Sequence, residues 1–392
     1  MSTASTGPAD HRPILIVPYM WIGDFVRCHS VVRLIKSRWP DRPVDMLATS
    51  LCAPLVDYMP GVRRGIVWDL PRKRLAFRDH GALSARLRAE AYGTALIMPR
   101  TWKSALAPWL AGVPERVGFF GEMRLGLLTD VRWDERRLPR MVDRCASLAL
   151  PRGAGAPPDW PQPQLVAPPA EVADWVRRRG LGQDTVAVAF APGAVGPSKR
   201  WPVGSYGAVA RQLTGRGINV WVIGGPNEKP LAVEIIAAAG PMARDLTGSD
   251  LRDAILALAA AKAAVSNDSG LLHVAAALGT PSIGIFGPTS PWHWAPLNPL
   301  FATIETETQL ACRPCHRPTC RAGHHRCMND IDGRRVIDAT LQALASAGVS
   351  GAARPFAPPE ASSTRADAGV TARAGLSDRP DAAVPMVPPP RQ

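Results

Sequence analysis

Apolar residues along the chain gather in short runs of four to six, separated by segments in which they recur at helical spacing. The short runs predict strands buried on both faces, and the spaced segments predict amphipathic helices. In the first half, strands are predicted at Pro13–Pro18, Val44–Ala48, Gly65–Trp68 and Thr94–Met98, and helices at Phe25–Arg38, Ala53–Met59, Leu83–Ala91, Trp102–Ala111 and Arg140–Leu150.

The same alternation restarts after residues 151–169, which contain seven prolines and two glycines and suit an interdomain linker. Strands are predicted at Thr185–Phe190, Val220–Ile223, Arg244–Leu246, Lys262–Ser266 and Ser282–Phe286, and helices at Ala170–Arg179, Val203–Arg216, Glu228–Ala239, Leu251–Ala261, Leu271–Leu278 and Arg334–Ala347. Strands alternating with helices predict parallel sheets, so we expect an α/β protein of two doubly wound, Rossmann-like domains facing a central cleft. The domains would span residues 13–150 and 170–349, with disordered ends at 1–12 and 350–392.

The charge balance indicates an acidic partner. The 392 residues carry a formal net charge of +13 and are 46% hydrophobic. Most of the basic excess lies in residues 1–150 and includes Arg63 and Arg64. Such a charge fits a nucleic acid, an anionic membrane surface or a phosphorylated substrate. No apolar run is long enough for a membrane span and the N-terminus lacks a signal-peptide pattern, so we expect a cytosolic protein.

Residues 266–291 form the most informative stretch, with a strand, a tight turn, a helix and a second strand. Asp268, Ser269, Gly270 and His273 stand at the start of that helix, after a strand. Free N–H groups and the positive helix end favour a phosphate there. The alternative is an ordinary capped helix with a core histidine.

Two further strand ends in the second half could serve the same ligand. The loop at residues 191–202 is glycine-rich, which lets the backbone approach an anion at Gly193, and it continues into Ser198 and Lys199. A solvated basic turn is the competing interpretation. Glu228 follows the next strand and could hold a ribose hydroxyl. The absence of a GxGxxG motif after the first strand weakens the case for a dinucleotide oxidoreductase.

In the first half, Trp21-Ile22-Gly23-Asp24 follows the first strand. Asp24 could be the N-cap of the following helix, or a carboxylate that faces the cleft as a general base. The two roles are compatible, but a helix N-terminus would lower the carboxyl pKa and moderate its basicity.

Four clustered cysteines raise the question of a metal. Cys312, Cys315, Cys320 and Cys327 lie within 16 residues, and a cytosolic location favours a structural zinc ion over disulfides. Their spacings differ from common zinc ribbons, so reduced thiols that brace a loop are an equal alternative. Asp330-Ile331-Asp332 resembles an Asp-x-Asp metal clamp, although helix capping explains it better.

Taken together, several motifs resemble the lipopolysaccharide heptosyltransferases of glycosyltransferase family 9, and within it the heptosyltransferase II branch. The resemblance runs from about Ile14 to Leu344. Its carriers are the segments Trp21–Asp24, Lys103–Pro108, Gly121–Leu128, Pro192–Ala194, Gly196–Pro202 and Asn267–Ala277.

The resemblance implies an inverting glycosyltransferase with the GT-B fold, which takes heptose from ADP-L-glycero-D-manno-heptose and adds it to the inner-core heptose of heptosyl-Kdo-lipid A. It implies Asp24 as the catalytic base. The implied donor-binding residues are Gly193, Ser198, Lys199, Glu228, Asp268, Ser269, Gly270 and His273. The implied acceptor-binding residues are Trp21, Gly23, Lys103, Glu122 and Arg124.

No catalytic cofactor is expected, because Lys199 and the helix end could stabilise the leaving diphosphate. The basic N-terminal half would suit a phosphorylated acceptor on the anionic cytoplasmic face of the inner membrane. A transferase for another sugar nucleotide or another core acceptor, of the heptosyltransferase I or III type, would keep the same base and lysine. A basic nucleic-acid-binding protein is a further alternative, but it should show aromatics interleaved with basic residues on one surface.

Overall fold

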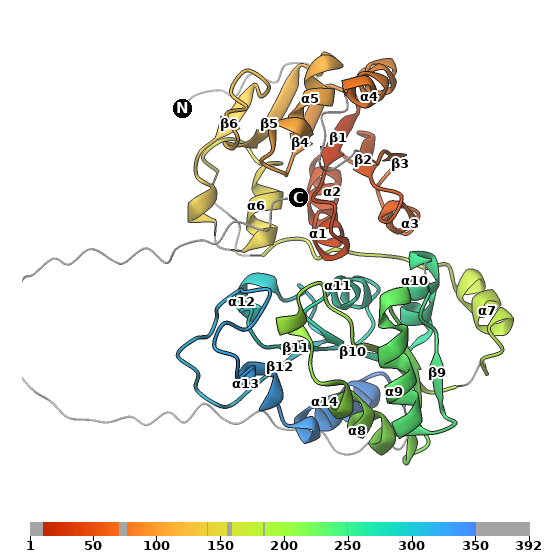
Figure 1. The fold of residues 1–392 in the computed structure, drawn as a ribbon. Coiled ribbons are helices and arrows are strands. Elements are labelled where there is room, and N and C mark those ends of the chain that lie inside the picture. The colour runs from red at the N-terminus through yellow and green to blue at the C-terminus, as the bar shows by residue number, and fades with distance from the viewer. Residues whose placement is uncertain are drawn as a thin grey trace, which may run out of the picture.

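The computed structural model describes residues 11–69, 77–138, 140–154, 159–182, 185–248 and 250–349, with Phe77 described by its main chain alone. It contains two six-stranded sheets, stacked one above the other in Figure 1, and every strand pair in them is parallel. The predicted α/β class is therefore confirmed. The predicted disorder of residues 1–10 and of 350–392 falls outside the described residues.

The N-terminal sheet has the strand order β3-β2-β1-β4-β5-β6. Its inner strands are uninterrupted apolar runs because helices cover both faces. The register places Leu15 beside Ala95. The strands are β1 (Ile14–Val17), β2 (Val44–Ala48), β3 (Arg64–Val67), β4 (Thr94–Ile97), β5 (Glu115–Phe119) and β6 (Asp130–Arg132), and the helices are α1 (Ile22–Arg27), α2 (His29–Arg38), α3 (Ala53–Val56), α4 (Phe77–Ala89), α5 (Trp102–Leu110) and α6 (Met141–Ser147), with a 3-10 turn at Glu135–Arg137.

The C-terminal sheet has the order β12-β11-β10-β7-β8-β9. Counted from its first strand, this is the same winding as the N-terminal sheet. The strands are β7 (Ala187–Ala191), β8 (Asn219–Val222), β9 (Ala243–Asp245), β10 (Ala263–Asn267), β11 (Ser282–Phe286) and β12 (Phe301–Glu305). The helices are α7 (Pro169–Arg178), α8 (Val203–Thr214), α9 (Lys229–Ala239), α10 (Leu251–Ala260), α11 (Gly270–Ala277), α12 (Pro291–Trp294), α13 (Arg326–Asn329) and α14 (Gly333–Ser346), with 3-10 turns at Pro197–Lys199 and Pro226–Glu228.

This topology fixes where a ligand can bind. In open parallel sheets, ligands bind at the carboxyl ends of the strands where the winding reverses direction. The reversal lies between β1 and β4 in the first sheet and between β7 and β10 in the second. The loops after β1, β7 and β10 are the three that carry the candidate chemistry, and in Figure 1 the helices α1 and α11 face each other across the domain boundary.

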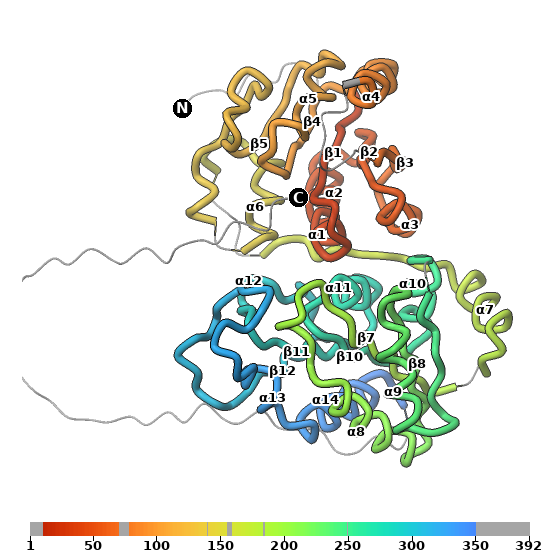
Figure 2. Tube along the Cα trace, viewed as in Figure 1, coloured from red at the N-terminus to blue at the C-terminus, as the bar shows by residue number. Residues whose placement is uncertain are grey.

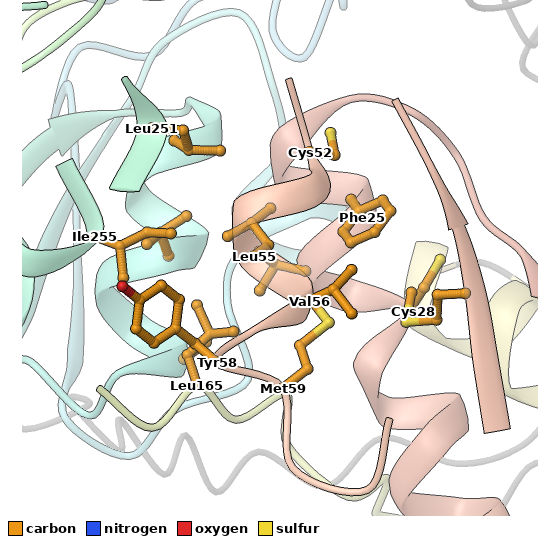
Figure 3. Packing of buried hydrophobic residues seen from close by; sticks show 14 of the residues in the cluster. Phe25, Cys28, Cys52, Leu55, Val56, Tyr58, Met59, Leu165, Leu251 and Ile255 are labelled. Carbon is orange, nitrogen blue, oxygen red and sulfur yellow. The ribbon is translucent and has the colours of Figure 1, made fainter. Parts of the chain in front are cut away.

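The two domains share one apolar cluster. Leu55 of α3 and the nearby Tyr58 lie opposite Leu251 and Ile255 of α10, and Leu165 of the linker closes the cluster (Figure 3). Each large apolar side chain buried in this way contributes roughly 1.5–3 kcal/mol. The interface between the domains is therefore a packed contact, and the path of the linker along it can be followed in Figure 2.

Polar contacts complete this interface. Arg252 of α10 donates to the Tyr58 hydroxyl at 2.8 Å and to Glu171 at 3.2 Å, and it also pairs with Asp57. Linker amides bond to both domains, since Leu165 N donates to Ala277 O and Val166 N to Tyr58 O, each at 2.8 Å.

Several element boundaries differ from the predictions. The helix predicted at Phe25–Arg38 is two helices divided at Cys28, and the first begins earlier, at Ile22. Strands β5, β6 and β12 were not predicted. Among the helices in the described ranges, none is both long and apolar enough to cross a membrane.

Candidate active site

The loops after β1 and β10 meet through two glycines. A Cβ atom built on Gly23 would lie 2.8 Å from Cδ2 of His273 and 3.4 Å from Cα of Gly270. One built on Gly270 would lie 2.7 Å from Cβ of Ile22. Both distances are shorter than ordinary carbon contacts. The start of α1 can therefore approach the start of α11 only because both positions lack a side chain.

Asp24 lies in the first turn of α1, and its side chain does not cap the helix. The N-cap is Trp21, and the Asp24 carboxylate instead accepts a hydrogen bond from Arg27, three residues later. The capping alternative considered for Asp24 is therefore not what the structure contains.

The Asp24 side chain is 17% exposed, in the contact zone of the two domains. Burial raises its pKa above the usual carboxyl value, while the positive charges of Arg27 and Lys199 oppose the rise and Asp268 adds to it. The expectation of a lowered pKa is corrected, because burial outweighs the lowering by Arg27 and Lys199. A raised pKa makes a carboxylate a stronger base.

His273 projects from α11 and is 4% exposed. Its Nε2 lies 2.7 Å from Nη2 of Arg27. Since a guanidinium only donates, Nε2 must accept and the ring proton sits on Nδ1. Burial and the charges of Arg27 and Lys199 lower the pKa of His273 well below its ordinary value, so the ring is neutral.

Lys199 and Asp268 form the polar centre of the second domain. Nζ of Lys199 lies 2.7 Å from Oδ2 of Asp268, which also accepts a hydrogen bond from Thr289 at 2.8 Å. The Asp268 side chain is 6% exposed and that of Lys199 is 32% exposed. The lysine therefore has an accessible ammonium whose direction is fixed by a buried carboxylate, and this excludes the solvated basic turn.

Asn267 holds the loops around this pair together. Its side-chain amide donates to Pro192 O at 2.6 Å, and its oxygen accepts from Trp201 N and from the Tyr206 hydroxyl, each at 3.2 Å. Asn267 is fully buried. It thus joins the loop after β7 to the loop after β10.

The remaining predicted donor residues have these positions. Glu228 lies against Gly193, where an added Cβ would be 2.6 Å from the Glu228 Cγ, and its carboxylate accepts from Gly225 N at 2.9 Å. Ser269 is the N-cap of α11 and its hydroxyl lies 3.0 Å from that of Ser266. Ser198 is buried and its hydroxyl donates to Arg317 O, so its side chain holds a loop.

The predicted acceptor residues separate into accessible and buried ones. Lys103 is half-buried on α5, and Trp21 is half-buried at the start of α1. Glu122 is exposed and accepts from Trp102 N at 3.2 Å, which satisfies the start of α5.

Arg124 is 1% exposed and donates to the carbonyls of Phe119 and Pro99. Because its guanidinium is used by the main chain, the expected acceptor contact is corrected to a role in holding the loop after β5. Burial lowers the pKa of Arg124 to about 10. At neutral pH it remains charged.

The basic residues Arg63 and Arg64 are engaged within the N-terminal domain. Both donate to the fully buried Asp45, Arg63 at 2.8 and 2.6 Å and Arg64 at 3.2 Å, and both pair with Glu90. The Tyr92 hydroxyl also donates to Asp45. Both side chains therefore neutralise a buried carboxylate and are also exposed, at 39% and 44%, so their part in an acceptor surface stays a prediction.

The cysteine loop packs against the donor loop. His325 Nε2 donates to Ser198 O at 2.7 Å, and Cys320 Sγ accepts from His325 N at 3.4 Å. Cys327 is buried, which raises its pKa to about 11. Within the described part of the chain, no group of three or more His, Cys, Asp or Glu side chains is arranged to hold a metal. The structural zinc ion stays a prediction.

The Asp-x-Asp segment caps a helix, as expected. Asp332 accepts from Arg334 N at 2.9 Å at the start of α14, and Asp330 pairs with Arg326.

Sequence reasoning missed Arg27, Thr289 and the joining role of Asn267. Arg27 carried one local signal, because a basic residue three positions after Asp24 lies on the same face of a helix. Thr289 carried none that separates it from any loop threonine.

Comparison with known proteins agrees with this geometry. Residues 80–325 match the family model described as glycosyltransferase family 9 (heptosyltransferase). The chain is 35% identical to lipopolysaccharide heptosyltransferase 2 of Salmonella typhimurium, over 86% of this chain and 99% of the relative. It is 32% identical to lipooligosaccharide heptosyltransferase 2 of Haemophilus influenzae, over 85% and 99% of the two chains. Among solved structures, ADP-heptose LPS heptosyltransferase II of E. coli superposes with a TM-score of 0.75 at 34% identity, covering 85% of this chain and 99% of that one.

Proposed function

Since this chain belongs to glycosyltransferase family 9, as its matched residues and overall fold establish, we propose that it transfers heptose from ADP-L-glycero-D-manno-heptose to the inner-core heptose of heptosyl-Kdo-lipid A. The expected GT-B architecture of a glycosyltransferase is confirmed with the family. The observation that carries the proposal is the placement of Asp24 beside the start of α11, on the opposite domain from Lys199.

This placement supports a direct displacement. An acceptor hydroxyl attacks the anomeric carbon of heptose from the side opposite ADP, Asp24 takes the hydroxyl proton, and the bond from that carbon to the diphosphate oxygen breaks. One new glycosidic bond forms, ADP leaves, and the configuration inverts. Only one carboxylate is required, because the diphosphate leaves as an anion.

The leaving diphosphate would be stabilised from the second domain. The ammonium of Lys199 and the free N–H groups at the start of α11 supply positive charge. Glu228, beside Gly193, is our proposed ribose contact. With these groups in place we expect no requirement for a divalent cation, so EDTA should leave the transfer rate within about twofold. A large loss that Mg²⁺ restores would contradict this part.

We also propose that the protein acts at an anionic membrane surface on the cytoplasmic side. Trp133 is 63% exposed and stacks on Phe120, with 4.2 Å between the ring centroids. Met123, nearby in the sequence, is 79% exposed. Arg136 and Arg137 follow and are exposed. Aromatic and aliphatic side chains beside cations suit the headgroup region of a bilayer. Sedimentation with anionic and neutral vesicles tests this, with Trp133→Ser as the variant expected to lose binding.

The direct test of the proposed function is transfer by the purified protein. ADP-heptose and heptosyl-Kdo-lipid A are supplied, and the product is analysed by mass spectrometry. Addition of a single heptose supports the proposal. Kdo-lipid A without heptose, core with two heptoses, and other nucleotide sugars serve as competing substrates, and preference for any of them would contradict the assignment.

A further inference from the structure

Arg27 lies between the two domains, at the end of α1, and is 7% exposed. One guanidinium nitrogen donates to the Asp24 carboxylate. The other lies 2.7 Å from Nε2 of His273 and 2.7 Å from the main-chain oxygen of Trp294. The guanidinium carbon also lies 5.4 Å from the centre of the Trp294 ring. A single planar group thus binds the carboxylate on one domain and two fixed acceptors on the other.

This arrangement uses the fork geometry that is particular to arginine. A guanidinium presents its N–H groups in a fixed plane, so contacts on one side orient those on the other. Within the described ranges, the hydrogen bond that the Asp24 side chain accepts comes from Arg27. The direction of the carboxylate is therefore set largely by Arg27.

The charges around Asp24 show why a cation is needed there. Burial disfavours the ionised form of the carboxylate, and the nearest positive groups oppose this effect of burial. The titratable or charged groups that face Asp24 are Arg27 on its own helix, Lys199 and Asp268 from the donor loops, Tyr19 from the loop after β1 and Cys145 from α6. When an anionic diphosphate binds at Lys199, the lysine charge is shared between the diphosphate and Asp24. Arg27 then remains as the counter-charge beside the base.

We propose that Arg27 is a positioning residue that aims the Asp24 carboxylate and couples its orientation to closure of the two domains through His273 and Trp294. This inference rests on the proposed function, in which Asp24 is the base. It assigns two separable tasks to one side chain. The positive charge keeps the carboxylate ionised, and the fork fixes its direction relative to the donor domain.

The two tasks predict different outcomes for two substitutions. Arg27→Met keeps the length of the side chain and removes the charge, so the acidic limb of the kcat/KM profile should move upward by about one pH unit or more. Its kcat should fall about 10- to 100-fold, as for a lost charge-assisted bond. Arg27→Lys keeps the charge but cannot reach both domains at once. Its acidic limb should stay near that of the wild type while kcat falls about 10-fold.

Arg252→Met is the matched control. Arg252 also joins the domains, and its polar partners among the residues that the structure describes are Tyr58, Asp57 and Glu171, which lie outside the candidate site. If a loss at Arg27 came only from a weakened interface, the two Met variants would behave alike. We expect Arg252→Met to keep the wild-type acidic limb and at least half of kcat.

The assay is heptose transfer across pH 5 to 9 by wild-type, Arg27→Met, Arg27→Lys and Arg252→Met proteins, with a melting curve for each. If Arg27→Met does not fold, the decision rests on Arg27→Lys against Arg252→Met. Unchanged kcat in a folded Arg27 variant, or equal losses in Arg27→Met and Arg252→Met with no shift of the limb, would overturn the proposal. A wild-type protein that transfers no heptose would instead refute the proposed function itself.

Discussion

Gly270→Ala tests whether the close approach of α1 and α11 is needed for catalysis. The added Cβ would lie 2.7 Å from Cβ and 2.9 Å from Cγ2 of Ile22. Ordinary carbon contacts are about 3.5–4.0 Å, so the shortfall is about 1 Å. Cβ of Ile22 is attached to the backbone and cannot rotate away. The strain must be relieved by moving the two helices apart.

The expected effect is a loss of turnover without a loss of folding. Overpacking of this kind costs about 1–3 kcal/mol. A displacement of about 1 Å between Asp24 and the donor loop can reduce the rate by about 100-fold. We therefore expect kcat to fall by about 10- to 100-fold while the protein stays folded and melts at a modestly lower temperature.

Steady-state transfer kinetics, ADP affinity and a melting curve measure these effects. Gly204→Ala is the matched control, because Gly204 is also near the start of a helix, in α8, and a Cβ there meets nothing within 4 Å. The control should keep full activity and gain slightly in stability. If Gly270→Ala keeps more than half of the wild-type kcat, the domains do not need this contact and the reasoning is wrong.

Two further predictions concern charge. Lys199→Met should weaken ADP binding by about 10- to 150-fold, which corresponds to the loss of a charge-assisted contact of about 1.5–3 kcal/mol. The control Lys262→Met, at the opposite end of β10, should leave the ADP affinity measured by calorimetry unchanged. Equal ADP affinities of the Lys199→Met and wild-type proteins would remove Lys199 from the site. His29 is buried and neutral between Pro60 O and Gln164 N, with its pKa lowered to about 4 from 6.5. The unfolded chain therefore binds a proton before the folded one as pH falls, and stability is lost between about pH 6.5 and 4. At pH 5 the loss is about 2 kcal/mol, which urea unfolding should detect in the wild type and not in His29→Gln; parallel pH dependence in both proteins would contradict this.

The sequence was sufficient for the parts of the fold that are locally determined. Strands buried on both faces, such as β1 and β7, are continuous apolar runs and were predicted. The missed strands are short or lie toward sheet edges: β6 has three residues, and β12 is mostly half-buried. Their strand state depends on pairing with a neighbour, which a local pattern does not contain.

The candidate site likewise contains residues that a local pattern predicts and contacts that it does not. Asp24, Lys199 and Asp268 could be predicted because each follows a strand, in a segment that contains a glycine. The contact of Arg27 with His273 spans 246 residues and depends on how two domains dock, so no spacing predicts it. Arg124 and Arg63 show a further limit of a local pattern. A basic residue in a strand-end or surface pattern can donate its hydrogen bonds to a buried carbonyl or carboxylate of the protein itself.

The most direct measurement of the central claim is the turnover of Asp24→Asn with ADP-heptose and heptosyl-Kdo-lipid A. Asn keeps the size of the side chain and a hydrogen-bonding oxygen for Arg27, but it cannot take a proton. Donor affinity should survive, because Lys199 and α11 belong to the other domain. The account predicts a folded protein, near-normal ADP binding and a kcat lower by about 100- to 10,000-fold. A folded Asp24→Asn protein with more than about a tenth of wild-type turnover would contradict the account.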